Sequence, residues 1–233
     1  MTPPPSWQKP VAITVATTFV VALLSRLPDS YSATAVGFAF LAVTYFLILR
    51  SDDSEKIARY GLSFGGLFDP EPLSLTRIAR ETGTALLWAL TLALICLPPF
   101  WLGFLWWWRI RVPFHAPPWS SLGSDFSGQL LVIALPEEAF YRGYLQSALD
   151  EVYRPRLRLF GAELGPGLLI TSALFALGHL CTEFNAARLA VFFPSLVFGY
   201  LRARTGGVGA GVVFHALCNL FASYLGQSYG FPR

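Results

Sequence analysis

Charged residues are scarce in this chain. Asp, Glu, Lys and Arg make up 13% of its 233 residues, hydrophobic residues make up 54%, and the mean hydropathy is +0.52. An average soluble domain carries about 25% charged residues. The composition therefore argues against a soluble globular domain and favours a polytopic membrane protein. The net charge of +3 is too small to indicate a nucleic-acid-binding surface, so we expect the lipid bilayer as a partner and no nucleic acid.

Cysteine is also rare. The three cysteines, Cys96, Cys181 and Cys218, are scattered and lack C-x-x-C spacing. They therefore do not suggest a disulfide framework or a thiolate zinc site. The H-E-x-x-H motif of zinc proteases is missing as well. No internal repeat stands out, which argues mildly against a transporter assembled from repeated halves.

Long apolar runs, in contrast, are abundant. They predict an all-α polytopic membrane bundle of about seven transmembrane helices, within a range of six to eight. Residues 1–125 would form an N-terminal membrane region with about three spans and an interfacial segment, and residues 126–233 a catalytic core with about four. The expected spans are residues 11–24, 33–49, 84–107, 126–149, 167–181, 187–200 and 208–225.

Three local features refine this outline. Pro98 and Pro99 are expected to bend or break the third span. Residues 73–80 are predicted to form a separate interfacial amphipathic helix. The first apolar run, residues 11–24, could instead be a cleaved signal peptide. Only one basic residue, Lys9, precedes it and a second apolar run follows at once, which favours a membrane span.

The basic residues predict an orientation. With the N-terminus in the cytoplasm, eleven of the 17 Lys and Arg residues fall in cytoplasmic segments and five outside, with Arg142 inside the membrane. This bias follows the positive-inside rule and predicts seven spans with a cytoplasmic N-terminus.

A charged stretch interrupts the fourth span. Glu137, Glu138 and Arg142 lie within an apolar run, where each charge costs at least about 2.5–3.5 kcal/mol, so a functional site is the default hypothesis. Glu138 and Arg142 are four residues apart and share one helix face, as an ion pair would. Glu137 points about 100° away around the helix and is the candidate general base.

Two further helices carry polar residues at the same spacing. His179 follows Phe175 by four residues on the fifth span, and Asn219 follows His215 by four on the seventh. Each of these residues alone has a structural interpretation, as part of a buried ion pair or a hydrogen bond between helices. Together, two Glu, one Arg, two His and one Asn can activate water and stabilise an oxyanion, which favours hydrolysis of a carbonyl compound.

These motifs resemble those of the CPBP family, which comprises CAAX proteases and bacteriocin-processing proteins and is also called the ABI family. The match consists of E-E-x-x-x-R-G at 137–143, F-x-x-x-H at 175–179 and H-x-x-x-N at 215–219. The resemblance implies an intramembrane endopeptidase of glutamic type. It implies that Glu137 activates the attacking water, that Glu138 and Arg142 support that site, and that His179 positions water or transfers protons. His215 and Asn219 would stabilise the oxyanion.

The resemblance leaves the metal and the substrate open. We expect no cofactor; a metal-dependent alternative would place Zn²⁺ on Glu137, His179 and His215. The expected substrate is a membrane protein or a lipid-anchored peptide, cut near its C-terminus. Relatives include CAAX-type prenyl-protein endopeptidases, bacteriocin self-immunity proteins and myxosortase-like sorting proteases that remove C-terminal anchors. The short chain favours a bacterial protein of the inner membrane.

Two alternatives to a protease stay open. One is a non-catalytic membrane interaction module that keeps the constellation for assembly. The other is a proton-coupled transporter that uses Glu137 and His179 as a relay.

Overall fold

Helices dominate the computed structural model, which describes residues 5–51, 53–68, 72–118 and 122–230. In chain order the elements are α1 (Gln8–Leu24), α2 (Asp29–Leu47), η1 (Leu49–Ser51), α3 (Ser54–Arg59), η2 (Phe64–Gly66), α4 (Leu75–Trp107), α5 (Leu122–Gly128), η4 (Gln129–Ala134), α6 (Leu135–Glu138), η5 (Ala139–Gln146), α7 (Ser147–Tyr153), β1 (Leu157–Leu159), β2 (Ala162–Leu164), α8 (Pro166–Thr182), η6 (Ala186–Val191), α9 (Phe192–Thr205) and α10 (Gly209–Ser228). We call the continuous run from α5 to α7 the central helix.

The all-α polytopic membrane fold is confirmed. Four helical segments are long and apolar enough to cross a bilayer: Asp29–Ser51, Leu75–Trp107, Ala186–Thr205 and Gly209–Ser228. The shorter α1 and α8 are also apolar. A helix lies at each of the seven expected positions, whereas the number of crossings and the cytoplasmic N-terminus stay predictions. The orientation prediction places the N-terminus in the cytoplasm and counts Arg233 among the five outside basic residues. Residues 1–4 and Arg233 lie outside the described residues.

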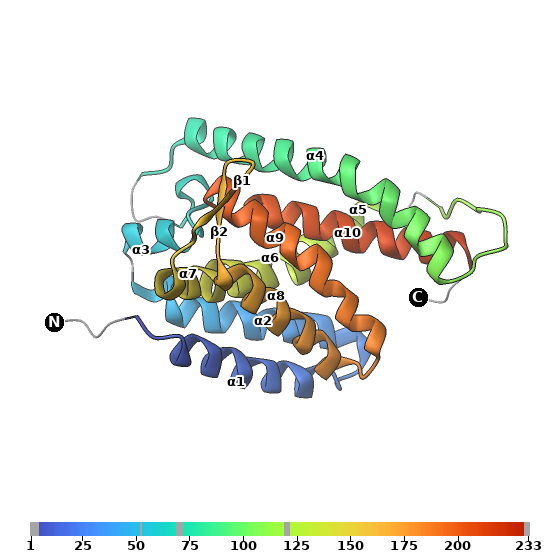
Figure 1. The fold of residues 1–233 in the computed structure, drawn as a ribbon, viewed down its shortest axis with the longest axis horizontal. Helices are drawn as coiled ribbons and strands as arrows, with labels where there is room; N and C mark the ends of the chain where they lie inside the picture. The colour runs from blue at the N-terminus through green and yellow to red at the C-terminus, as the bar shows by residue number, and fades with distance from the viewer. Residues whose placement is uncertain (1–4, 52, 69–71, 119–121, 231–233) are drawn as a thin grey trace.

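The central helix lies inside the bundle (Figure 1). On one side α1 and α2 cover it: α2 packs on η4, α6 and η5, and α1 packs on α2 and α8. On the other side α4 runs along α10, which in turn packs on η4 and α9. Helices from both halves of the chain therefore enclose the segment that carries the two glutamates.

The structure corrects two expectations about α4. The helix is continuous from Leu75 to Trp107 and does not break at Pro98 or Pro99. Neighbouring helices and local adjustment commonly re-satisfy backbone groups freed by proline in membrane helices. The separate amphipathic helix predicted at residues 73–80 is also wrong, since Ser74 caps the start of α4 by accepting a hydrogen bond from the Arg77 amide.

The loop expected after the central helix contains a two-stranded hairpin. Strands β1 and β2 pair antiparallel, and Arg158 lies opposite Glu163. Phe160 and Gly161, between the strands, have φ of 45° and 80°, as a two-residue turn of type I′ requires.

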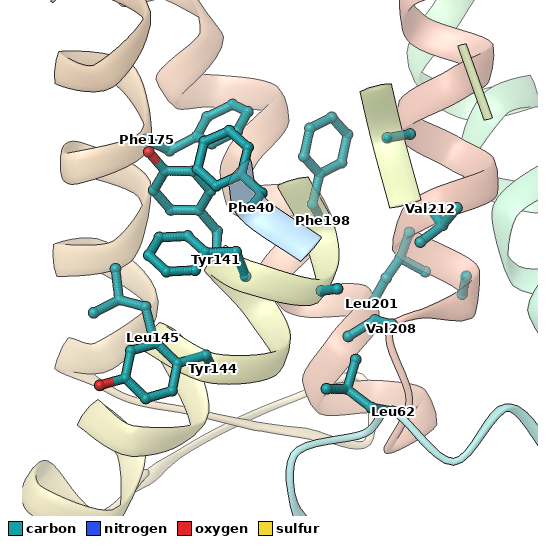
Figure 2. Close-up of a cluster of buried hydrophobic side chains, with 14 of the residues drawn as sticks. Phe40, Leu62, Tyr141, Tyr144, Leu145, Phe175, Phe198, Leu201, Val208 and Val212 are labelled. Carbon is teal, nitrogen blue, oxygen red and sulfur yellow. The ribbon is translucent and has the colours of Figure 1, made fainter. Parts of the chain in front are cut away.

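Aromatic side chains form much of the buried core (Figure 2). The Tyr141 ring lies 5.6 Å from that of Phe40 on α2 and 5.0 Å from that of Phe175 on α8. Such contacts between rings stabilise a fold beyond the burial of their area. They fix η5 between α2 and α8 and so set the position of the adjacent glutamates.

The central helix departs from α-helical geometry on both sides of the Glu-Glu pair. Segments η4 and η5 are π-helical, a rare geometry often found at functional sites. Pro136 has no N–H to donate to the carbonyl of Val132, four residues before it, which favours the wider winding. Gly37 of α2 packs against this carbonyl: an added Cβ would clash with the Val132 oxygen. The widened turn thus depends on a residue without a side chain at position 37.

We expect Gly37→Ala to destabilise the protein by about 1–3 kcal/mol, because the methyl group meets backbone that cannot rotate away. Gly83→Ala in α4 is the matched control, since nothing lies within 4 Å of its added Cβ. Thermal unfolding of the detergent-solubilised protein measures both variants. Equal melting temperatures for the two would contradict this account of α2 packing.

Candidate functional site

A fully buried ionic group forms the base of the site. The Glu138 and Arg142 side chains are both 0% exposed, and Arg142 Nη1 lies 3.1 Å from Glu138 Oε1. His215 Nδ1 on α10 lies 3.0 Å from the same oxygen, so its N–H donates to the carboxylate. Glu138 Oε1 therefore links η5 to α10, because it contacts the Arg142 guanidinium of η5 and the His215 imidazole of α10. Gly211, one turn before His215, leaves room for this carboxylate, since its Cβ would lie 3.0 Å from Glu138 Oε2.

Helix α9 holds the arginine from the opposite side. Arg142 Nη2 donates to Ser195 Oγ at 2.6 Å, and Ser195 is fully buried. The guanidinium carbon also lies 4.4 Å from the centre of the Phe175 ring and 5.1 Å from that of Phe198. Contacts of this kind stabilise a desolvated cation. The Phe198 ring stacks in turn on His215 at 4.6 Å and 14°. Ser195 and Phe198 thus orient two of the predicted site residues.

A cavity of about 560 Å³ lies next to this buried group. Glu137, His179 and Asn219 line it together, from α6, α8 and α10. Part of its remaining wall comes from the N-terminal helices, including Thr18 of α1 and Phe40 of α2. The volume suits a short peptide segment or a small ligand.

Two side chains that line this cavity, Glu137 and His179, can accept a proton. Glu137 Oε2 has no hydrogen-bond partner in the described part of the chain and lies 3.9 Å from His215 Nε2. His179 Nδ1 lies 3.0 Å from the Phe175 carbonyl, which can only accept, so this nitrogen carries a proton. The neutral ring then presents Nε2 as an acceptor. The arrangement offers a carboxylate and an imidazole on one cavity wall.

An amide pair closes the site. Asn219 Nδ2 donates to Gln129 Oε1 at 2.9 Å, and both residues line the cavity. This bond fixes the Asn219 amide and leaves its second N–H available.

The structure brings the six predicted site residues into two adjacent layers. Glu137, His179 and Asn219 line the cavity, while Glu138, Arg142 and His215 lie in the buried layer behind it. Their catalytic roles stay predictions. Sequence reasoning missed Gln129, Ser195 and Phe198. A glutamine within an apolar run was a signal for the first, but a serine and a phenylalanine on an apolar helix gave none.

The described residues contain no group of three or more His, Cys, Asp and Glu arranged to hold a metal ion. Both imidazoles direct Nδ1 away from the cavity, to Glu138 or to the Phe175 carbonyl. These bonds use only Nδ1 and leave Nε2 of each ring without one of them, so the alternative ligand set of Glu137, His179 and His215 stays a prediction.

Comparison with known proteins gave one family. Residues 119–221 match the family model described as type II CAAX prenyl endopeptidase Rce1-like. This segment contains all six predicted site residues as well as Gln129, Ser195 and Phe198. Neither a search of curated proteins nor a search of solved structures gave a match.

We expect Ser195→Ala to lower the stability by about 1–3 kcal/mol, because it leaves a buried guanidinium N–H without its side-chain acceptor. Ser172→Ala is the matched control: Ser172 is equally buried, but its Oγ has no hydrogen-bond partner. Thermal unfolding compares the two variants. A Ser172→Ala effect as large as that of Ser195→Ala would show that the Arg142 contact contributes nothing specific.

Proposed function

We propose that this chain is a glutamic-type intramembrane endopeptidase, because residues 119–221 match the family model of Rce1-like type II CAAX prenyl endopeptidases. It would hydrolyse a peptide bond near the C-terminus of a membrane-associated protein. One observation carries the glutamic mechanism: the Glu137 carboxylate lines the same cavity as His179, and its Oε2 makes no hydrogen bond in the described chain.

In this proposal Glu137 acts as the general base. The Glu137 carboxylate accepts a proton from a cavity water while the water oxygen forms a bond to the scissile carbonyl carbon. Nε2 of His179 accepts the second hydrogen of the water and so orients it. Glu137 then returns the proton to the nitrogen of the leaving amine as the C–N bond breaks. The products are a free carboxylate and a free amine, without a covalent intermediate.

Donors on α10 would stabilise the tetrahedral oxyanion. Asn219 offers the N–H that Gln129 does not use. His215 offers Nε2, which requires a proton on both ring nitrogens and is balanced by the Glu138 carboxylate at Nδ1. Glu138 and Arg142 touch no substrate in this scheme: they hold His215 at the angle that directs Nε2 toward Glu137 at the cavity wall.

The substrate class has two candidates within this function. One is a prenylated protein of the CAAX type, as the family description suggests. The other is a C-terminal sorting anchor of a bacterial surface protein, with the enzyme in the inner membrane and its N-terminus in the cytoplasm. A self-immunity protein, a non-catalytic module and a proton-coupled transporter are the alternatives that the experiments below separate from proteolysis.

Replacing Glu137 by Gln removes the base but keeps the side-chain shape. We expect cleavage to fall by about 10²–10⁴-fold, the usual contribution of general-base catalysis. Mass spectrometry of membrane-protein C-termini in cells with equal amounts of wild type or Glu137→Gln measures it, and Glu163→Gln on the exposed hairpin is the control. Identical C-termini in all strains would contradict proteolysis. Flux that follows a pH gradient without new C-termini would establish the transporter instead.

Metal removal tests the glutamic mechanism. We expect 1,10-phenanthroline to leave cleavage by the purified protein unchanged, since the attacking water is activated by Glu137 alone. The readout is the rate of product formation before and after chelation. Inhibition that added Zn²⁺ reverses would contradict the proposal and favour Glu137, His179 and His215 as metal ligands.

A further inference from the structure

A single basic residue lines the main cavity. Among the described residues that line it, Arg188 is the one Lys or Arg, and two acids, Glu137 and Glu183, line the cavity with it. It lies on η6, the 3₁₀ helix that follows α8, so it faces the cavity from the segment just beyond His179. A lone cation in a site that processes peptides is a candidate for recognising an anionic group of the ligand.

The guanidinium of Arg188 has unused hydrogen-bonding capacity. Its Nε lies 3.1 Å from Glu183 Oε2, yet this nitrogen is buried and makes no hydrogen bond within the described chain. Glu183 is itself 58% exposed, and an ion pair so open to solvent contributes little. Arginine has five N–H donors in a planar fork that matches a carboxylate, and the bidentate pair is among the stronger interactions of proteins. An incoming carboxylate can therefore replace Glu183 at small cost.

The size of the cavity indicates where that carboxylate comes from. A volume of about 560 Å³ admits a short extended segment and not a folded domain. A short segment that enters by its end brings either a terminal ammonium or a terminal carboxylate. Arg188 is the lining residue able to pair with the carboxylate, whereas Glu137 and Glu183 would pair with an ammonium.

We propose that Arg188 binds the free α-carboxylate of the substrate, so that the enzyme measures its cleavage site from the C-terminal end of the chain. This subsite rests on the proposed endopeptidase function. It adds a specificity-determining residue outside the three motifs, and it makes a free C-terminus part of what the enzyme recognises.

Three peptides and four proteins, the fourth being Arg188→Lys, test the subsite. Each peptide carries a farnesylated cysteine followed by three apolar residues and ends in a free acid, in a carboxamide, or in a carboxamide with an aspartate as its last residue. The full-length wild type, Arg188→Gln and Arg111→Gln are compared by kcat/KM in liposomes. Arg111 is an exposed arginine that does not line the cavity.

We expect wild type and Arg111→Gln to cleave the acid about 10- to 100-fold better than either carboxamide, as suits one charged hydrogen-bonding group. Arg188→Gln would cleave the acid no better than the carboxamides. Arg188→Lys would retain part of the preference, since it keeps the charge without the fork.

Several results would overturn the subsite. Equal cleavage of acid and carboxamide by wild type would do so, and would also be the result if Arg188 bound a lipid phosphate. A preference that survives in Arg188→Gln would place the recognition elsewhere. Full cleavage of the aspartate carboxamide would assign Arg188 to an acidic side chain rather than to the chain end. Cleavage of none of the peptides would contradict a prenylated CAAX-type substrate, and with it this subsite, and would favour the sorting anchor as the substrate of the proposed endopeptidase.

Discussion

The structure depends on one buried carboxylate. Glu138 is inaccessible to solvent, and its Oε1 receives both the Arg142 guanidinium and the His215 imidazole. An isolated charge at this depth would be strongly destabilising, and removing one partner of a buried pair leaves an uncompensated charge. The helices η5 and α10 must therefore meet in one register, with Gly211 beside the carboxylate. We attribute the buried ionic group to the single register that it imposes on these two helices, rather than to a gain in net stability.

The buried Glu138 carboxylate also determines what α9 contributes to the site. The Arg142 guanidinium uses one edge for its ion pair with Glu138, so its other N–H groups need acceptors. Ser195 accepts a hydrogen bond from one of them. Two aromatic rings cover the faces of the guanidinium, and one of them, Phe198, also fixes the plane of His215. The histidine that turns Nε2 toward Glu137 is thus held by a bond at one edge and by stacking on its face. Orientation of this kind is what an oxyanion donor needs before substrate arrives.

The sequence predicted the helices and the motif residues well, for physical reasons. Apolar runs mark membrane helices because hydrocarbon tolerates little else, and charges inside such runs stand out for the same reason. Ser195 and Phe198 could not be found in this way, because a serine and a phenylalanine are ordinary in a packed membrane helix. Of the bend or break expected at Pro98 and Pro99, the break does not occur. Sequence propensity could not decide between the two, because membrane helices commonly accommodate proline by local adjustment.

The cavity joins two parts of the chain that differ in what they contribute. The groups able to move protons all come from the segment after residue 125, whereas α1 and α2 contribute wall surface with Thr18, Gly37 and Phe40. Mutation of the wall alters the shape offered to a ligand without touching the ionic group that orients His215. Changes at wall residues that do not support the central helix would therefore alter which ligands fit while the reaction stays the same. Gly37 and Phe40 are excepted, because they pack on the segments that carry the glutamates.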